Sequence, residues 1–272
     1  MLELRRGRTL LIRRLWALLL RHVYVHIGSW PRIVEMLYWP LINMLLWGFT
    51  SLYVVRKLTG VNIIGSALVG GTLLNEVFAR MCLMMVLLFL EEVWSRNLGH
   101  LFASPLTFMD YALGLIGTAL LRAVLSVLPA MVAAYYLFGF SIFSFGWALP
   151  PFIFLLIFNG CWYGLIIVSM VIRYGLSAEW LAWMSIWLLS PLMAPYYPVA
   201  ILPKTLQYVS WSLPGTYVFD AMKELIGQNT VNVHDLWMAL TLNVIYSCCA
   251  AFIYNRAYRS AQKRGGILQV GE

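Results

Sequence analysis

The chain has 272 residues, of which 62% are hydrophobic and only 11% are charged, and its formal net charge is +8. An ordinary soluble domain carries about 25% charged residues, so this composition excludes a soluble globular fold and predicts an all-α integral membrane protein. The length suffices for about six spans of roughly 20 residues each, together with their connections.

The basic residues gather toward the two ends of the chain. Seven of the 19 lysines and arginines lie in residues 1–32 and four lie in residues 256–264. Positive charge collects on the cytoplasmic flanks of membrane spans. We therefore expect both termini in the cytoplasm, which requires an even number of spans. Because the positive charge is explained by the membrane flanks, we expect no nucleic-acid partner.

The first expected element is an amphipathic helix over residues 9–27. Arg13, Arg14, Ala17 and Arg21 fall within one quarter of the helical wheel, and apolar residues fill the remainder. This pattern predicts a helix in the headgroup plane with its basic face toward the cytoplasm. It does not match a signal peptide, because arginines interrupt the apolar run and no small-residue cleavage site follows.

Six transmembrane helices are expected next in chain order, at about residues 31–55, 61–90, 111–138, 147–172, 179–195 and 235–255. A polar segment, residues 91–107, separates the second span from the third on the cytoplasmic side. No internal repeat or linker divides the chain, so residues 1–272 are expected to form a single membrane domain.

The segment over residues 196–234 fits neither a span nor a free loop. It is too polar and too broken by prolines to cross the membrane, yet too apolar to lie free in water. Two short amphipathic helices, TLQYVSWS and TYVFDAMKELIG, are expected here, separated by Pro214 and Gly215. We expect re-entrant helices in the outer leaflet, backed by protein; an outer loop with surface helices is the alternative.

No catalytic, metal or cofactor motif occurs in the sequence. There is no phosphate-binding loop, the dipeptide Gly-Lys is absent, and H-E-x-x-H, G-x-S-x-G and C-x-x-C are missing. The four cysteines lie in apolar runs, and the four histidines lie near span ends or connections. The chain is therefore not expected to be an enzyme or to bind a cofactor. Energy for uphill transport would come from another chain or from an ion gradient.

Three charged residues are expected inside spans. Glu76 and Arg80 are four residues apart and share one helix face, and Arg122 on the third span could join them. An unpaired charge at mid-membrane costs about 2.5–3.5 kcal/mol, and pairing reduces that cost. The group is either a gate, ion relay or substrate contact, or a structural ion pair or unspecific polar cavity lining. Glu76 is the only carboxylate expected deep in a span, which argues against ion coupling.

Tryptophans form a second candidate feature. Trp180, Trp183 and Trp187 have i, i+3, i+7 spacing and form one stripe, while Trp39 and Trp47 form a looser pair on the first span. Such residues often make an aromatic belt at the membrane interface. The alternative is an aromatic-lined substrate path, for which the candidates are Trp39, Trp47, Trp183 and Trp187.

The order of these parts resembles the ABC-2-type permease family, the membrane subunits of bacterial ABC exporters. Four features carry the resemblance: the helix over residues 9–27, the charged segment EEVWSRNLGHLFASPLT, the proline-rich YYPVAILPKTLQ, and LPGTYVFDAMKELI before the last span. The resemblance covers essentially the whole chain.

This resemblance implies a type V exporter fold in which two permease chains pair as a homodimer and each binds a cytoplasmic ABC ATPase subunit that holds ATP and Mg. It implies a multi-pass protein of the bacterial inner membrane, with lipid around it. Residues 91–107 resemble the family's coupling helix, and the implied ATPase-coupling positions are Glu91, Glu92, Arg96, Ser104 and Pro105.

The expected function is therefore export of an amphiphilic substrate, which could be a drug, a lipid or lipid-linked glycan, or a small metabolite. Two other classes remain open at this point. One is a secondary transporter or channel driven by an ion gradient, and the other is a membrane enzyme or assembly factor without transport.

Overall fold

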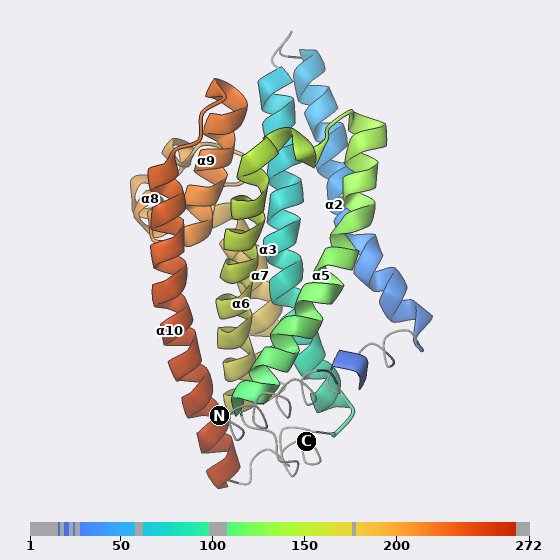
Figure 1. The fold of residues 1–272 in the computed structure, drawn as a ribbon, viewed down its shortest axis with the longest axis vertical. Coiled ribbons are helices and arrows are strands. Elements are labelled where there is room, and N and C mark those ends of the chain that lie inside the picture. Colours follow the sequence, from blue (N-terminus) through green and yellow to red (C-terminus); the bar gives the residue numbers. More distant parts are fainter. Residues whose placement is uncertain are drawn as a thin grey trace, which may run out of the picture.

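The computed structural model describes residues 28–57, 62–97, 108–175 and 178–264, together with residues 16, 19–21 and 24. These residues form helices and short connections, with no strand among them. The elements in chain order are α2 (Trp30–Lys57), α3 (Asn62–Trp94), α5 (Phe108–Phe138), η1 (Ile142–Ala148), α6 (Leu149–Tyr174), α7 (Glu179–Leu192), η3 (Val199–Ile201), α8 (Lys204–Trp211), α9 (Pro214–Gln228) and α10 (Val233–Arg264). Figure 1 shows the long helices side by side in one elongated bundle.

Five helical segments are long and apolar enough to cross a membrane: Trp30–Lys57, Ile63–Trp94, Met109–Phe138, Ile142–Tyr174 and Val233–Ala261. They confirm five of the six predicted spans. The remaining one, predicted over residues 179–195, corresponds to α7, which has only 14 residues. At 1.5 Å per residue, α7 rises about 21 Å, less than the roughly 30 Å of a hydrocarbon core.

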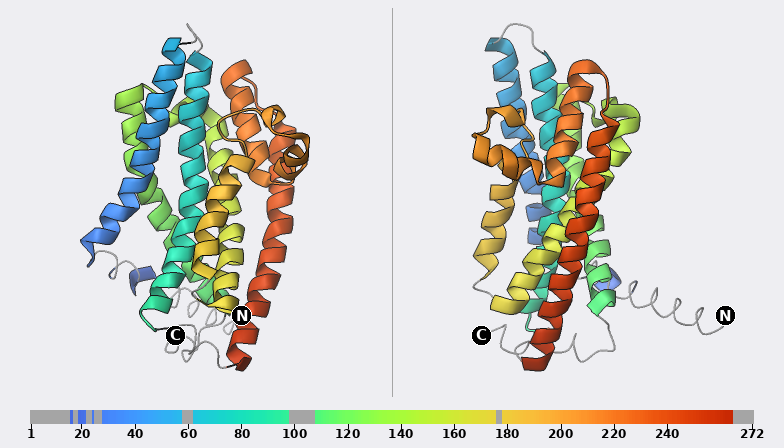
Figure 2. Two further views of the ribbon diagram at one scale, coloured as in Figure 1. Left: turned by 180° about the vertical axis from the view of Figure 1, so that it is seen from behind. Right: turned by 90° about the vertical axis from the view of Figure 1, so that its left-hand side faces the viewer.

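The helix α3 lies at the centre of the bundle. In its most apolar window 83% of the residues are buried within the protein, against 17% for α10. Figures 1 and 2 show α3 between α2 and α5 on one side and α6 on the other. Polar groups on α3 are thus shielded by protein, whereas α10 presents most of its surface outward.

The end of α3 differs from the prediction. The second span was expected to finish near residue 90 and a separate helix to begin at Glu91, but α3 continues to Trp94 and contains both Glu91 and Glu92. The chain then turns, and Arg96 adopts a positive φ of 53°. The rest of the predicted coupling helix, residues 98–107, lies outside the described residues. So does most of the predicted helix over residues 9–27, of which residues 16, 19–21 and 24 are helical.

The segment between α7 and α10 contains the two predicted short helices, α8 and α9. Pro214 and Gly215, expected as a spacer, instead form the first turn of α9, a position that proline favours. One face of α9 is buried against the bundle (Figure 2). Its backing by protein matches the expectation, while the depth of α8 and α9 in a bilayer stays a prediction.

A close backbone contact fixes the end of α7 against α3. A Cβ atom at Gly71 would lie 2.4 Å from the backbone oxygen of Pro195, so only glycine permits this approach. Lys223 of α9 adds a second tie, because its Nζ donates hydrogen bonds to the carbonyl oxygens of Ala194 (3.3 Å) and Tyr197 (3.0 Å).

Candidate functional site

The predicted ion pair within α3 is present. Arg80 Nε lies 3.0 Å from Glu76 Oε2, and the two side chains are 4% and 3% exposed. Asn43 Nδ2 of α2 donates to the other oxygen, Glu76 Oε1, at 2.7 Å. Both carboxylate oxygens are therefore hydrogen-bonded, as a buried charge requires.

Arg122 reaches a different carboxylate from the one expected. Its Nη1 and Nη2 donate to Glu91 Oε1 and Oε2 at 3.1 and 3.3 Å, which is a bidentate arrangement. The Arg122 side chain is 5% exposed and that of Glu91 is 13% exposed. This pair joins α5 to the last turn of α3.

Two further ion pairs meet at the same turn. Arg32 Nη1 of α2 lies 3.8 Å from Glu91 Oε2. Arg21 Nη2 donates to Glu92 Oε2 at 2.7 Å, and Asn97 Nδ2 donates to the same oxygen at 2.8 Å. We call this group the α3 junction; its members are Glu91, Glu92, Asn97, Arg21, Arg32 and Arg122.

The α3 junction changes the interpretation of Glu91 and Glu92. The family resemblance implied that they are ATPase-coupling positions, and in the fold both side chains are largely buried and paired with arginines of this chain. Arg96, in contrast, is exposed and forms no ion pair with any described residue. Ser104 and Pro105 lie outside the described residues.

A cavity of about 320 Å³ lies beside the α3 junction, between α2, α3, α5 and α7. Three of the four predicted substrate-path tryptophans line it: Trp39, Trp183 and Trp187. The fourth, Trp47, stacks on Tyr196 with ring centroids 4.1 Å apart, and Trp180 is absent from the lining and 76% exposed. The predicted tryptophan set is thus brought together only in part.

The cavity has both charged and apolar walls. Its charged lining residues are Arg32, Glu35, Arg80, Glu91 and Arg122, and its other lining residues are Met36, Trp39, Leu83, Met84, Leu87, Trp94, Trp183 and Trp187. Arg80 and Arg122, expected to lie together, therefore share this cavity although they pair with different carboxylates. A volume in this range with apolar walls and a few polar groups is typical of a small-molecule site.

Sequence reasoning missed Arg32, Glu35 and Trp94 as members of the site. One signal was available, since Arg80, Leu83, Leu87, Glu91 and Trp94 recur at helical spacing and mark one face of α3. That signal requires α3 to continue past residue 90, whereas the polar residues there predict the end of a span.

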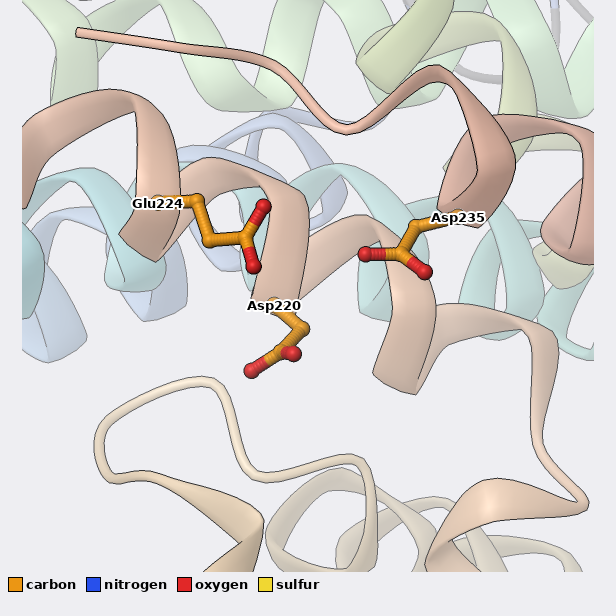
Figure 3. Close-up of side chains that lie close together, drawn as sticks. All are labelled: Asp220, Glu224 and Asp235. Atoms are coloured by element: carbon orange, nitrogen blue, oxygen red, sulfur yellow. The ribbon is translucent and has the colours of Figure 1, made fainter. Parts of the chain in front are cut away.

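A separate acidic cluster lies at the other end of the bundle. Carboxylate oxygens of Asp220, Glu224 and Asp235 lie within 4.8 Å of one another (Figure 3). Lys223 Nζ is 3.3 Å from Asp220, and His234 Nδ1 is 3.5 Å from Asp235. Burial, with Asp235 and Asp220 nearby, raises the pKa of Glu224. Such clusters are common without an ion, and we assign no metal site here.

The model of the ABC-2 type transporter family matches residues 13–226, which is more than half of the chain and includes the cavity and the α3 junction. No curated protein gave a significant match. The chain belongs to the ABC-2 type transporter family, the membrane components of ABC transporters, which associate with an ABC ATPase.

Proposed function

We propose that this chain is the permease subunit of an ATP-driven exporter that moves an amphiphilic substrate outward across the bacterial inner membrane. The observation that carries the proposal is the cavity between α2, α3, α5 and α7, which is lined by tryptophan, arginine and glutamate side chains together. Apolar walls suit an acyl chain or ring system, and the charged residues suit a polar headgroup. A drug, a lipid or lipid-linked glycan, and a small metabolite remain the candidate substrates.

Two permease chains pair as a homodimer and each binds one ATPase subunit, which holds ATP and Mg. This assembly follows the family's implied organisation, in which hydrolysis occurs on the partner. The residues after Asn97 are the proposed coupling segment, and exposed Arg96, with Ser104 and Pro105, is proposed to meet the ATPase. The partner therefore acts on the segment directly behind the last turn of α3.

The α3 junction would transmit movement of that coupling segment to the proposed substrate cavity. Glu91 lines the cavity and also pairs with Arg122 of α5, while Glu92 holds Arg21 in the N-terminal segment. Displacement of the last turn of α3 would move both contacts. We therefore assign Glu91 and Glu92 to transmission within the permease rather than to docking on the ATPase.

The path of the chain supports six crossings with both termini in the cytoplasm. The start of α2 and the end of α10 lie at the same end of the bundle (Figure 1), which five crossings alone would not allow. In Figure 2, α7 starts at the end where α6 finishes and runs toward the opposite end. We propose that α7, although short, supplies the sixth crossing with the residues that follow it.

The experiment is amphiphile-stimulated ATP hydrolysis by the permease reconstituted with its ATPase. The variant Trp183→Ala with Trp187→Ala removes two rings from the cavity, and an aromatic anchor is worth about 2 kcal/mol in a binding site. We expect the amphiphile concentration for half-maximal stimulation to rise at least tenfold. The matched control is Trp180→Ala on the same helix, outside the cavity, and equal effects in both variants would contradict the proposal.

A further inference from the structure

A second hollow, of about 390 Å³, lies between α6 and α10 and shares no lining residue with the cavity described above. Its polar lining residues are Ser169, Arg173, Tyr174, Arg256 and Ser260, and its apolar lining residues are Ile166, Met170, Phe252, Ile253 and Ala257. An adjoining hollow shares Phe252, Arg256 and Ser260 and adds Asn255 and Arg259. We call the two together the α6–α10 groove.

The charged part of the α6–α10 groove is uncompensated. Arg173, Arg256 and Arg259 are exposed, and none of them pairs with a carboxylate among the described residues. Arg173 lies over the ring of Tyr174, at 5.5 Å from its centroid. Elsewhere in the bundle, the buried arginines Arg80 and Arg122 each meet a glutamate. The groove therefore attracts an anion that the described residues do not supply.

The apolar part of the groove lies farther from the ends of α6 and α10 than the arginines do. The helices α6 and α10 run in the same direction (Figure 1), and Ile166, Met170, Phe252 and Ile253 precede the arginines in sequence. Phe252 is 65% exposed on the most outward-facing of the five long helices. An apolar surface with a basic rim near the helix ends has the polarity of a phospholipid at a bilayer surface.

We propose that the α6–α10 groove binds an anionic phospholipid from the leaflet at this end of the bundle. The phosphate lies between Arg173 and Arg256, with Arg259 beside it, and an acyl chain lies along Phe252 and Ile253. Charge-assisted hydrogen bonds from guanidinium groups to phosphate are among the strongest available in proteins. The site is separate from the proposed substrate cavity and does not depend on the proposed function.

One side chain favours a headgroup that carries hydroxyls. The amide oxygen of Asn255 is buried and accepts no hydrogen bond, and Asn255 lines the part of the groove next to Arg259. A glycerol headgroup would give this oxygen a donor. Phosphatidylglycerol is therefore the probe for the experiment, and phosphatidylcholine is the neutral reference.

The test measures binding of phosphatidylglycerol to the permease in phosphatidylcholine nanodiscs, by native mass spectrometry and by the rise in thermal unfolding temperature. The variant Arg173→Gln with Arg256→Gln removes two basic groups, each of which contributes to attraction at an anionic membrane surface. We expect the affinity for phosphatidylglycerol to fall about 30-fold. The unfolding temperature in pure phosphatidylcholine should stay unchanged, which shows that the variant folds.

The matched control is Arg56→Gln with Lys57→Gln, an exposed basic pair at the opposite end of the bundle, which should keep wild-type affinity. Equal loss in this control, or retention by the double arginine variant, would overturn the proposal. So would saturation of the site by inorganic phosphate alone. Loss of ATPase co-purification in the arginine variant with lipid binding intact would reassign the groove to the partner protein.

Discussion

At the end of α3, Glu91 and Glu92 face guanidinium groups from Arg122, Arg32 and Arg21, whereas at the other end of the bundle Asp220, Glu224 and Asp235 face one another. The carboxylates of the first group are largely buried, and they join the last turn of α3 to the start of α2 and the middle of α5. The second is more exposed, and among the described residues Lys223 and His234 are the basic side chains that contact it. Removing a carboxylate should therefore destabilise the α3 junction and relieve repulsion in the acidic cluster.

The largest effect is expected for Glu91→Ala. This change removes the carboxylate that accepts two hydrogen bonds from the buried Arg122, and breaking a buried ion pair costs about 3 kcal/mol or more. Thermal unfolding of the purified permease should show a clear drop in midpoint. Glu35→Ala, in the same cavity but exposed, is the control and should change stability by no more than about 0.5 kcal/mol.

Lys223→Met should have the next largest effect. The ammonium group donates to the carbonyl oxygens of Ala194 and Tyr197 as well as pairing with Asp220, so its loss frees the end of α7 from α9. Hydrogen bonds from a charged donor contribute about 2 kcal/mol. Lys204→Met, at an exposed position of α8, should leave the unfolding midpoint unchanged; an equal shift would show that the carbonyl contacts do not matter.

A smaller coupling is expected between Arg21 and Glu92. The guanidinium is partly exposed, at 38%, although the carboxylate is 4% exposed, so solvent weakens the interaction. A double-mutant cycle with Arg21→Gln and Glu92→Gln should give a coupling of about 1 kcal/mol. Strict additivity would mean that the N-terminal segment is not held at the α3 junction.

These contacts mark where sequence reasoning succeeded and where it failed. The pair Glu76–Arg80 follows from spacing within one helix, so it could be predicted without knowing the packing. The partner of Arg122 depends on how far α5 is shifted along α3, which no local pattern records.

The predicted end of the second span at residue 90 is wrong for a related reason. Charged residues usually mark the end of a span, yet α3 continues to Trp94 because arginines from other segments offset the charges of Glu91 and Glu92. The end of α7 shows a limit of another kind. The helix ends at Leu192, with Pro191 in its last turn, whereas the sequence predicted a span to about residue 195. The shortness of α7 could not be read from hydropathy, because the residues that follow it are also apolar.

The smallest expected effect is a pH dependence in the acidic cluster. The pKa of Glu224 is raised above its unfolded value by burial and by Asp235 and Asp220, so the folded state holds this proton more tightly. Stability from this group should therefore fall as the pH rises from about 4.5 through the raised pKa. Glu224→Gln should flatten this part of the curve by no more than about 0.5 kcal/mol, since the site is partly exposed. If stability depended more steeply on pH in the variant than in the wild type, the predicted effect of Glu224 would have the wrong sign.

The most direct test of the proposed export function is ATP-driven movement of a fluorescent acyl-chain amphiphile into inverted vesicles that contain the permease and its ATPase. We expect accumulation with ATP and none with a proton gradient alone. We also expect that Glu91→Gln retains ATP hydrolysis while accumulation falls at least tenfold, because the α3 junction no longer joins the coupling segment to the cavity. Accumulation driven by the proton gradient without ATP, or full transport by Glu91→Gln, would contradict it.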